Sequence, residues 1–246
     1  MVNLLSKRQS QPRDVENTFS GIIQIPIDSM ELEAEWIMPA NACGIVLFAH
    51  GSGSSRHSRR NQFVASVLRE SGLGTCLLDL LTRDEERTDA ASGQFRFDID
   101  LLTNRLITAT RWLGAHASGK NHRIGYFGAS TGGAAAIAAA AIMGPSVYAV
   151  VSRGGRPDLA YKQLPHVQAP TLLIVGERDE AVIQLNKEAY QRLRCIRKMA
   201  IVPGATHLFE EPGALEKVAS LAAGWFQYHL SQSPCDIEMA HNGEKP

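Results

Sequence analysis

The sequence predicts an α/β fold, in which one domain holds a mostly parallel sheet with helices on both of its faces. The chain has 246 residues, which is enough for a single substantial core. Short runs rich in Val, Ile and Leu alternate with longer stretches of helical periodicity. Most of the short runs are continuously apolar, which is typical of strands that are buried on both faces.

Eight runs have the length and composition of strands, and the first two are close enough to form an antiparallel hairpin through Asp28 and Ser29. The predicted strands are 22–27, 32–38, 44–49, 74–79, 123–127, 147–152, 171–175 and 198–202. The predicted helices are 61–71, 98–115, 130–143, 182–193 and 212–230. Polar, aperiodic sequence predicts flexible segments over 1–20 and 231–246, which leaves 21–230 as the single folded domain.

The charge balance gives no reason to expect a nucleic acid or an anionic membrane as partner, because 25 basic residues match 25 acidic ones. No run reaches the roughly 18 apolar residues of a membrane span, and the first residues do not resemble a signal peptide. We therefore expect a cytoplasmic protein. The four cysteines form no metal-binding pattern, and Cys43 and Cys76 lie in apolar runs, where buried free thiols are expected. The oligomeric state is left open.

A sharp turn from strand to helix is predicted at Gly128-Ala129-Ser130-Thr131-Gly132. In this context the pattern Gly-x-Ser-x-Gly is the nucleophile elbow of serine hydrolases, in which small flanking residues leave the hydroxyl exposed. The start of the following helix favours developing negative charge. A glycine-rich helix start, a serine N-cap and a phosphate loop are the alternatives, and the phosphate loop lacks its usual fingerprints.

The sequence HGSGSSR, residues 50–56, follows the third predicted strand and forms a glycine-rich loop. Backbone N–H groups of such a loop can form an oxyanion hole with the N–H of the residue after the nucleophile, Thr131. We expect the second donor to be Ser52, with Gly51 as the alternative. His50 is interpreted as a structural histidine that fixes this loop by hydrogen bonds.

Two further residues complete a candidate triad. Asp179 follows the seventh predicted strand, and a carboxylate there can orient a histidine and stabilise its cation. His207 follows the last predicted strand. The six histidines other than His50 and His207 fall in helix, loop or tail positions, where surface residues are expected: His57, His116, His122, His166, His229 and His241. The order Ser130, Asp179, His207 is that of α/β-hydrolases.

The motifs HGSGSSR, GASTGG, VGERDEAV and GATHLFEEPG resemble those of the α/β-hydrolase superfamily, and within it those of the dienelactone-hydrolase-related group. The resemblance covers about 21–230 and implies an eight-stranded sheet with a reversed second strand. It also implies Ser130 as nucleophile, His207 as general base and acid, Asp179 as orienting acid, and Ser52 and Thr131 as oxyanion donors. Dienelactone hydrolase itself has a cysteine nucleophile, so a serine here favours a carboxylesterase.

The resemblance implies a serine hydrolase that cleaves carboxylic esters of small to medium acyl chain through an acyl-enzyme, without a metal or organic cofactor. A lactonase or dienelactone-type hydrolase of carboxylate-bearing substrates, a thioesterase, an amidase and an acyltransferase share this intermediate and remain alternatives. A non-catalytic binding protein with the same fold is the alternative from another class. A small-molecule ester, as substrate, is the only binding partner that we expect.

The surroundings of the expected site give two further expectations. Only residues 153–170 separate the sixth and seventh predicted strands, so little or no lid is expected there. Arg56, Arg153 and Arg156 are candidate substrate-binding residues, because guanidinium groups bind carboxylates in a fork. The alternative is that they pair with structural acids such as Asp79, Asp158 or Glu210.

Overall fold

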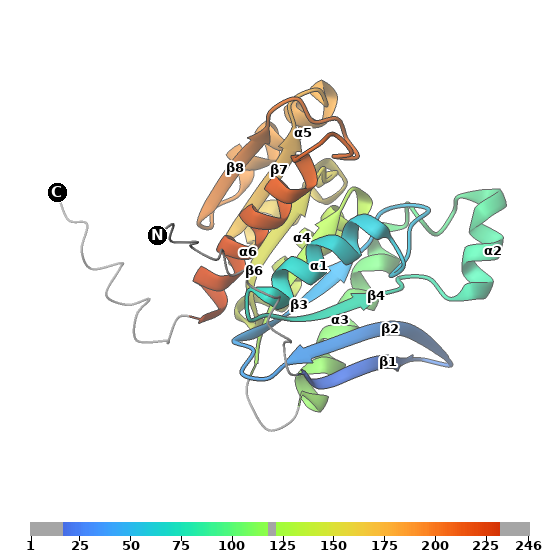
Figure 1. Ribbon diagram of the computed structural model, residues 1–246. Helices are drawn as coiled ribbons and strands as arrows, with labels where there is room; N and C mark the ends of the chain where they lie inside the picture. The colour runs from blue at the N-terminus through green and yellow to red at the C-terminus, as the bar shows by residue number, and fades with distance from the viewer. Residues whose placement is uncertain (1–16, 118–121, 232–246) are drawn as a thin grey trace, which may run out of the picture.

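The computed structural model of the chain describes residues 17–117 and 122–231. Within these ranges a single eight-stranded sheet forms the centre of the molecule, in the order β1-β2-β4-β3-β5-β6-β7-β8 (Figure 1). The strands are β1 (Asn17–Ile27), β2 (Met30–Pro39), β3 (Gly44–Ala49), β4 (Gly74–Leu78), β5 (Arg123–Ala129), β6 (Val147–Arg153), β7 (Thr171–Gly176) and β8 (Arg197–Val202). The eight predicted strands are therefore confirmed.

The second strand is reversed, as the resemblance implies. Strand β2 is antiparallel to both of its neighbours, β1 and β4, whereas every other neighbouring pair is parallel. The carboxyl ends of the parallel strands therefore meet at one edge of the sheet, where ligands bind in open α/β folds.

Helices cover both faces of the sheet. They are α1 (Arg59–Glu70), α2 (Arg83–Ser92), α3 (Ile99–His116), α4 (Thr131–Met143), α5 (Glu180–Arg192) and α6 (Ala214–Ser231), with short 3₁₀ helices η1 (Gly144–Ser146), η2 (Pro157–Ala160) and η3 (Leu164–His166). Strand β3 shows the two cores that result. Its Ile45 and Leu47 pack in the cluster that holds α3 and α4, whereas Val46 and Phe48 pack in the cluster that holds α1 and α6.

Helix α2 was not predicted, because its sequence RDEERTDAAS is too polar to show an apolar face. A capping box starts it, in which the Thr82 side chain accepts from the Glu85 N–H and the Glu85 side chain accepts from the Thr82 N–H. Glu85 also forms an ion pair of 2.5 Å with Arg105 of α3, whose side chain is only 3% exposed. The helix projects from the sheet (Figure 1), and the ion pair with Arg105 joins it to α3.

Several expected boundaries shift slightly. Strand β1 begins at Asn17, so residues 17–20, which we expected in a flexible segment, belong to the sheet through antiparallel pairing with β2. Helix α6 extends to Ser231. The rest of the two predicted terminal segments, 1–16 and 232–246, lies outside the described residues.

The first turn of α4 lies against the end of β3 with no room for a side chain between them. A Cβ atom on Gly132 would come within 2.5 Å of the His50 carbonyl oxygen and still closer to that of Ala49. A Cβ on Gly128 would lie 2.5 Å from the Gly132 carbonyl oxygen. These two glycines therefore permit the sharp turn between β5 and α4.

The variant Gly132→Ala is expected to lower the free energy of unfolding by about 2–3 kcal/mol, since the added methyl group overlaps backbone atoms that cannot move independently. Urea denaturation followed by circular dichroism measures this change. Gly114→Ala on α3 is the matched control, because nothing lies within 4 Å of the added atom. It should be neutral or stabilise by up to about 1 kcal/mol. Equal effects of the two substitutions would contradict this packing argument.

Candidate active site

Ser130 occupies the turn between β5 and α4 in a strained conformation, with φ 52° and ψ −121°. Holding a residue other than glycine in this backbone conformation costs about 1–3 kcal/mol, and such strain is concentrated at functional sites. Three hydrogen bonds fix its backbone. Its N–H donates to the Arg153 carbonyl at 3.2 Å, and its carbonyl accepts from Gly133 at 2.9 Å and from Arg156 at 3.1 Å. Its side chain caps no N–H group of α4.

His207 and Asp179 form a hydrogen-bonded pair, with 2.6 Å between Nδ1 of the imidazole and Oδ2 of the carboxylate. The histidine side chain is 39% exposed, whereas that of Asp179 is 14% exposed. A carboxylate accepts and does not donate, so the proton of a neutral His207 lies on Nδ1. The lone pair of Nε2 is then available to accept a proton.

The two loops that carry this pair are joined backbone to backbone. The N–H of Glu177 donates to Val202 at 3.0 Å, and the N–H of Arg178 donates to Ala205 at 2.9 Å. A Cβ atom on Gly176 would lie 2.6 Å from the Thr206 carbonyl oxygen, so only a glycine allows this approach. The close contact places the carboxylate beside the imidazole.

The segment from Arg153, the last residue of β6, to Arg156 contacts both Ser130 and His207. Its Arg153 and Arg156 make the backbone hydrogen bonds to Ser130, and Gly154 lies between them with φ 52°. A Cβ atom on Gly154 would be 3.4 Å from Cε1 of His207. Serine, histidine and aspartate are thus gathered at the carboxyl edge of the sheet, although no hydrogen bond joins the Ser130 hydroxyl to His207 within the described residues.

The glycine-rich loop after β3 lies directly against Ser130. A Cβ atom on Gly51 would be 3.0 Å from the Cβ of Ser130, and the Ser52 hydroxyl is 3.0 Å from the Thr131 hydroxyl. The Thr131 N–H is at the first position of α4, where no intrahelical acceptor exists. Within the described ranges, the N–H groups of Gly51 and Ser52 donate to no backbone carbonyl. Both therefore remain candidate donors beside Thr131.

His50 fixes this loop by hydrogen bonds, as expected. Its Nδ1 lies 2.9 Å from the Gly51 carbonyl, and its Nε2 accepts from the Leu80 N–H at 2.9 Å. Its side chain is buried, and burial lowers the pKa of the imidazole. A neutral ring with its proton on Nδ1 satisfies both contacts.

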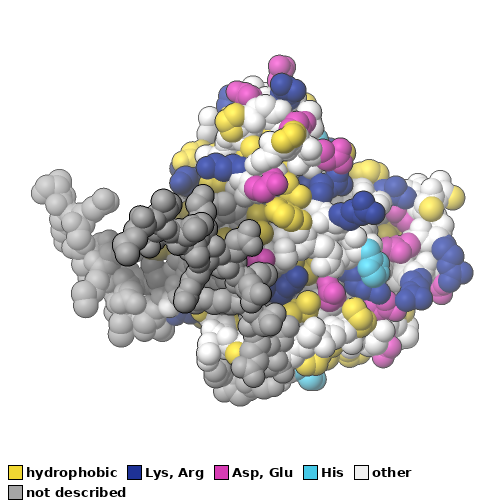
Figure 2. All heavy atoms as spheres, viewed as in Figure 1, with side chains coloured by type: hydrophobic (Ala, Val, Ile, Leu, Met, Phe, Trp, Pro, Cys, Tyr) yellow, Lys and Arg dark blue, Asp and Glu magenta, His cyan; other side chains and the backbone are white. Residues whose placement is uncertain are grey.

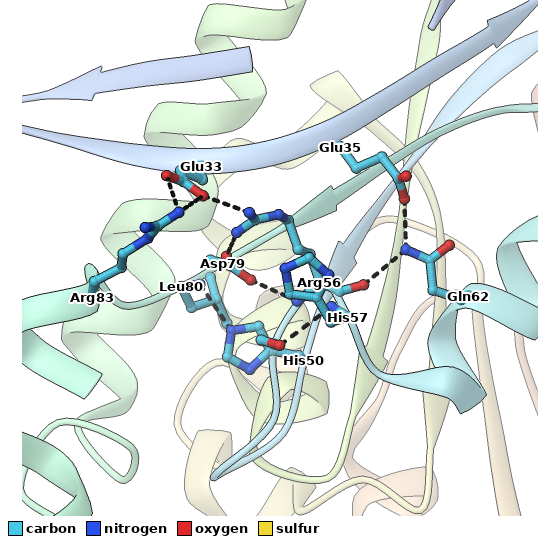
Figure 3. A network of polar contacts seen from close by, with 10 residues as sticks. Glu33, Glu35, His50, Arg56, His57, Gln62, Asp79, Leu80 and Arg83 are labelled. Atoms are coloured by element: carbon cyan, nitrogen blue, oxygen red, sulfur yellow. Dashed lines mark hydrogen bonds and ion pairs between the residues drawn. The ribbon is translucent and has the colours of Figure 1, made fainter. Parts of the chain in front are cut away.

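Arg56 ends the same loop and is held by carboxylates rather than directed at a substrate (Figure 3). Its guanidinium pairs with Asp79 and with Glu33, the latter at 2.5 Å, and its N–H donates to Asp79 at 2.6 Å. Its carbonyl accepts from Gln62 at 2.9 Å. The contact with Asp79 is the structural pairing that we considered as the alternative for Arg56.

The other two candidate arginines lie in different surroundings. Arg156 forms two hydrogen bonds with Asp158, of 2.7 and 2.9 Å, so it too pairs with a structural acid. Arg153 is 7% exposed and donates to the Asn61 side chain at 3.4 Å. Burial and the nearby Arg60 lower the pKa of Arg153 to about 10. Glu210, the third acid considered as an alternative partner for these arginines, pairs with Arg60 instead.

A cavity of about 310 Å³ opens beside the glycine-rich loop. Thr131 and the loop residues His50 to Ser55 form one wall. The opposite wall comes from α2 and the segment after it, with Glu86, Asp89 and Arg96 as its charged residues. Sequence reasoning missed this wall. The one signal for it was the pattern Thr-x-x-Glu at 82–85, which marks the start of a helix.

Most other histidines and cysteines match their expected surroundings. His57, His116 and His166 are exposed and Cys76 is buried, while Cys43 is half-buried. His229 is a correction, because it is only 9% exposed and packs against Trp225 on the inner side of α6. His241 lies outside the described residues. No helix among the described residues is long and apolar enough to span a bilayer.

Two curated proteins are similar to this chain over most of its length. Two curated relatives from strains of Mycobacterium tuberculosis, each named putative phosphoribosyl transferase, are 52% identical over 208 residues. That match covers 85% of this chain but 46% of each relative, so the chain spans about half of their length.

Solved structures also resemble this chain. A dienelactone hydrolase from Anabaena variabilis is 52% identical with a TM-score of 0.84, covering 86% of this chain and 98% of its own. Carboxyl esterase 2 from Tuber melanosporum shares the fold, with a TM-score of 0.69 at 18% identity over 89% of each chain. The profile of the Dienelactone hydrolase family matches residues 33–229. The chain is therefore a member of the dienelactone hydrolase family, with the α/β-hydrolase fold.

Proposed function

We propose that this protein hydrolyses carboxylic esters through an acyl-enzyme formed on Ser130. One observation carries the proposal. Ser130 has a strained backbone and a hydroxyl that does not cap α4, and it lies at the same edge of the sheet as His207, whose Nδ1 is hydrogen-bonded to the Asp179 carboxylate. This arrangement of nucleophile, base and orienting acid is the one that activates serine for acyl transfer. Membership in a hydrolase family supports it.

The reaction proceeds in two halves. In the first, Nε2 of His207 takes the Ser130 proton as Oγ attacks the ester carbonyl, and backbone N–H groups of Thr131 and of Ser52 or Gly51 stabilise the oxyanion. Collapse of the tetrahedral intermediate breaks the ester bond, and the alcohol leaves with the proton from His207. In the second, water gives a proton to His207 and attacks the acyl-enzyme, which releases the acid and restores Ser130. Asp179 stabilises the imidazolium in both halves.

The size of the site favours small to medium esters. The cavity of about 310 Å³ is at the lower end of the range for ligand pockets. The connection from β6 to β7 contains only the short helices η2 and η3, so it supplies no α-helical lid. Helix α2 lines the opposite side and limits the length of chain that the cavity accepts.

The name of the curated relatives supports no second function for this chain. It describes proteins of which this chain matches 46%, and the matching part overlaps the residues that fit the hydrolase family. We therefore assign hydrolase chemistry to this part. A lactone is a cyclic ester and would follow the same steps, and neither a lactone nor a purely binding role is favoured by an observation of its own.

Ser130→Ala is expected to reduce the hydrolysis of p-nitrophenyl butyrate at least about 10³-fold, because the nucleophile is lost while the oxyanion donors remain. Steady-state assays on p-nitrophenyl esters from acetate to dodecanoate measure this loss and the preferred chain length. Ser146→Ala, at an exposed position in η1, is the control and should keep full activity. Near-native turnover by the Ser130→Ala protein would rule out the proposed mechanism.

Arg56→Lys is expected to lower kcat about 10- to 100-fold with little change in KM, because lysine cannot bridge two carboxylates in the same geometry and the oxyanion loop loses its support. Arg83→Lys is the matched control. Arg83 also pairs with Glu33, but its side chain is 76% exposed, so its replacement should change kcat less than about twofold. Unchanged kcat in the Arg56→Lys enzyme would show that the ion pairs do not position the loop.

A further inference from the structure

The cavity beside the oxyanion loop has three charged side chains in its wall, Glu86, Asp89 and Arg96. Its remaining lining consists of the loop serines and of apolar residues such as Leu80 and Leu102. His50 also lines it but is neutral, as its two hydrogen bonds require. The charge that a bound substrate meets therefore depends on how these three residues are paired.

Asp89 and Arg96 neutralise each other. Their side chains form an ion pair of 2.5 Å, and Arg96 also donates to the Asp89 carbonyl at 2.5 Å. The Asp89 carboxylate accepts from the backbone N–H groups of Phe95 and Arg96, at 2.7 and 3.1 Å. The Asp89 side chain is only 4% exposed, so this pair forms a fixed and neutral part of the wall.

The cations nearest to Glu86 are also neutralised. Arg56 is shared by Asp79 and Glu33, and Arg83 is bound to Glu33 by contacts of 3.0 and 3.2 Å (Figure 3). Two arginines thus balance two carboxylates. The surface around α2 shows the same mixture, with basic and acidic side chains side by side at the right of Figure 2.

Glu86 is the carboxylate that remains after this pairing. It is half-buried and lines the cavity from α2. Its N–H donates to the Thr82 carbonyl at 2.8 Å, but within the described residues its carboxylate forms no hydrogen bond and no ion pair of 4.0 Å or less. Burial and the neighbouring Asp79 raise the pKa of Glu86. When Glu86 is ionised, the charged residues of the cavity wall therefore carry one negative charge in excess.

We propose that Glu86 is a specificity-determining residue, which restricts this cavity to the uncharged part of an ester and excludes substrates that carry a carboxylate. The inference rests on the proposed function, in which this cavity, whose wall contains Thr131 but not Ser130, receives part of the ester. Two negative charges a few ångströms apart near a protein surface repel each other strongly enough to reduce binding at least about tenfold. Arg56, Arg96 and Arg156 cannot offset this repulsion, because their charge is already shared with Glu33, Asp79, Asp89 and Asp158. Arg153 donates to Asn61 rather than to an acid, but it does not line this cavity.

The test compares two substrates with acyl chains of six carbons, p-nitrophenyl hexanoate and mono-p-nitrophenyl adipate, at pH 8, because alkaline pH favours the ionised form of Glu86. Each kcat/KM is divided by the rate of hydrolysis by hydroxide, to remove intrinsic reactivity. The wild-type protein should favour the neutral ester at least about tenfold. Glu86→Gln, which removes the charge and keeps the shape, should reduce this preference about tenfold.

Asp84→Asn is the matched control. Asp84 is on the same helix, and its replacement removes the same charge, but its side chain is 86% exposed and does not line the cavity. It should leave the preference unchanged. An equal preference in the wild-type and Glu86→Gln proteins, or an equal shift in the Asp84→Asn protein, would overturn the proposal.

A binding measurement separates this proposal from the proposed function. In Ser130→Ala protein, NMR titration with methyl hexanoate and with monomethyl adipate gives both dissociation constants without turnover. Weaker binding of the anionic ester, relieved about tenfold by adding Glu86→Gln, supports the role of Glu86 even if Ser130 were not the nucleophile. Equal binding of the two esters would reject that role whatever the activity assays show.

Discussion

The site depends on one close contact, the approach of the first turn of α4 to the carboxyl end of β3. Because Gly132 has no side chain, the helix start lies against the Ala49 and His50 carbonyls, and the chain must turn sharply at Ser130 to reach it. The same contact brings the Thr131 N–H beside the glycine-rich loop that follows β3. The proposed nucleophile and oxyanion donors are thus positioned by backbone packing, and side-chain interactions stabilise this arrangement.

Those side-chain interactions are mostly ionic and concern one loop. His50 joins the start of the loop to the end of β4, and Arg56 joins its end to carboxylates on β2 and after β4. A charge in this position is costly to bury, and two carboxylates and several hydrogen bonds offset that cost. Arg56, one of the three arginines considered as candidates to bind a carboxylate, is therefore held by structural acids, and the carboxylate of Glu86 in the neighbouring cavity has no ion pair among the described residues.

Sequence patterns were sufficient for the sheet and for the order of the candidate triad. Strand β3 was predicted to the residue, since Gly44 and His50 border a continuous apolar run, and the serine turn was visible from Gly128 and Gly132. Helix α2, which was not predicted, is stabilised by its capping box and by an ion pair with Arg105. A search for apolar periodicity cannot detect such polar interactions. The partners of Arg56 and Arg153 were equally hidden, because they come from segments far away in sequence and only the packed fold selects among many acids.

Asp179 and His207 of the candidate triad follow the last two strands of the sheet, β7 and β8, whereas Ser130 follows the central strand β5. Strand β8 pairs on one side only, and the loops after β7 and β8 carry Asp179 and His207. Local opening of a protein begins at such edges, at a smaller free energy than global unfolding. Fraying of β8 would therefore move His207, the proposed base, away from Ser130 while the centre of the sheet stayed folded, so heating would disrupt the proposed catalytic arrangement first at its outermost strand.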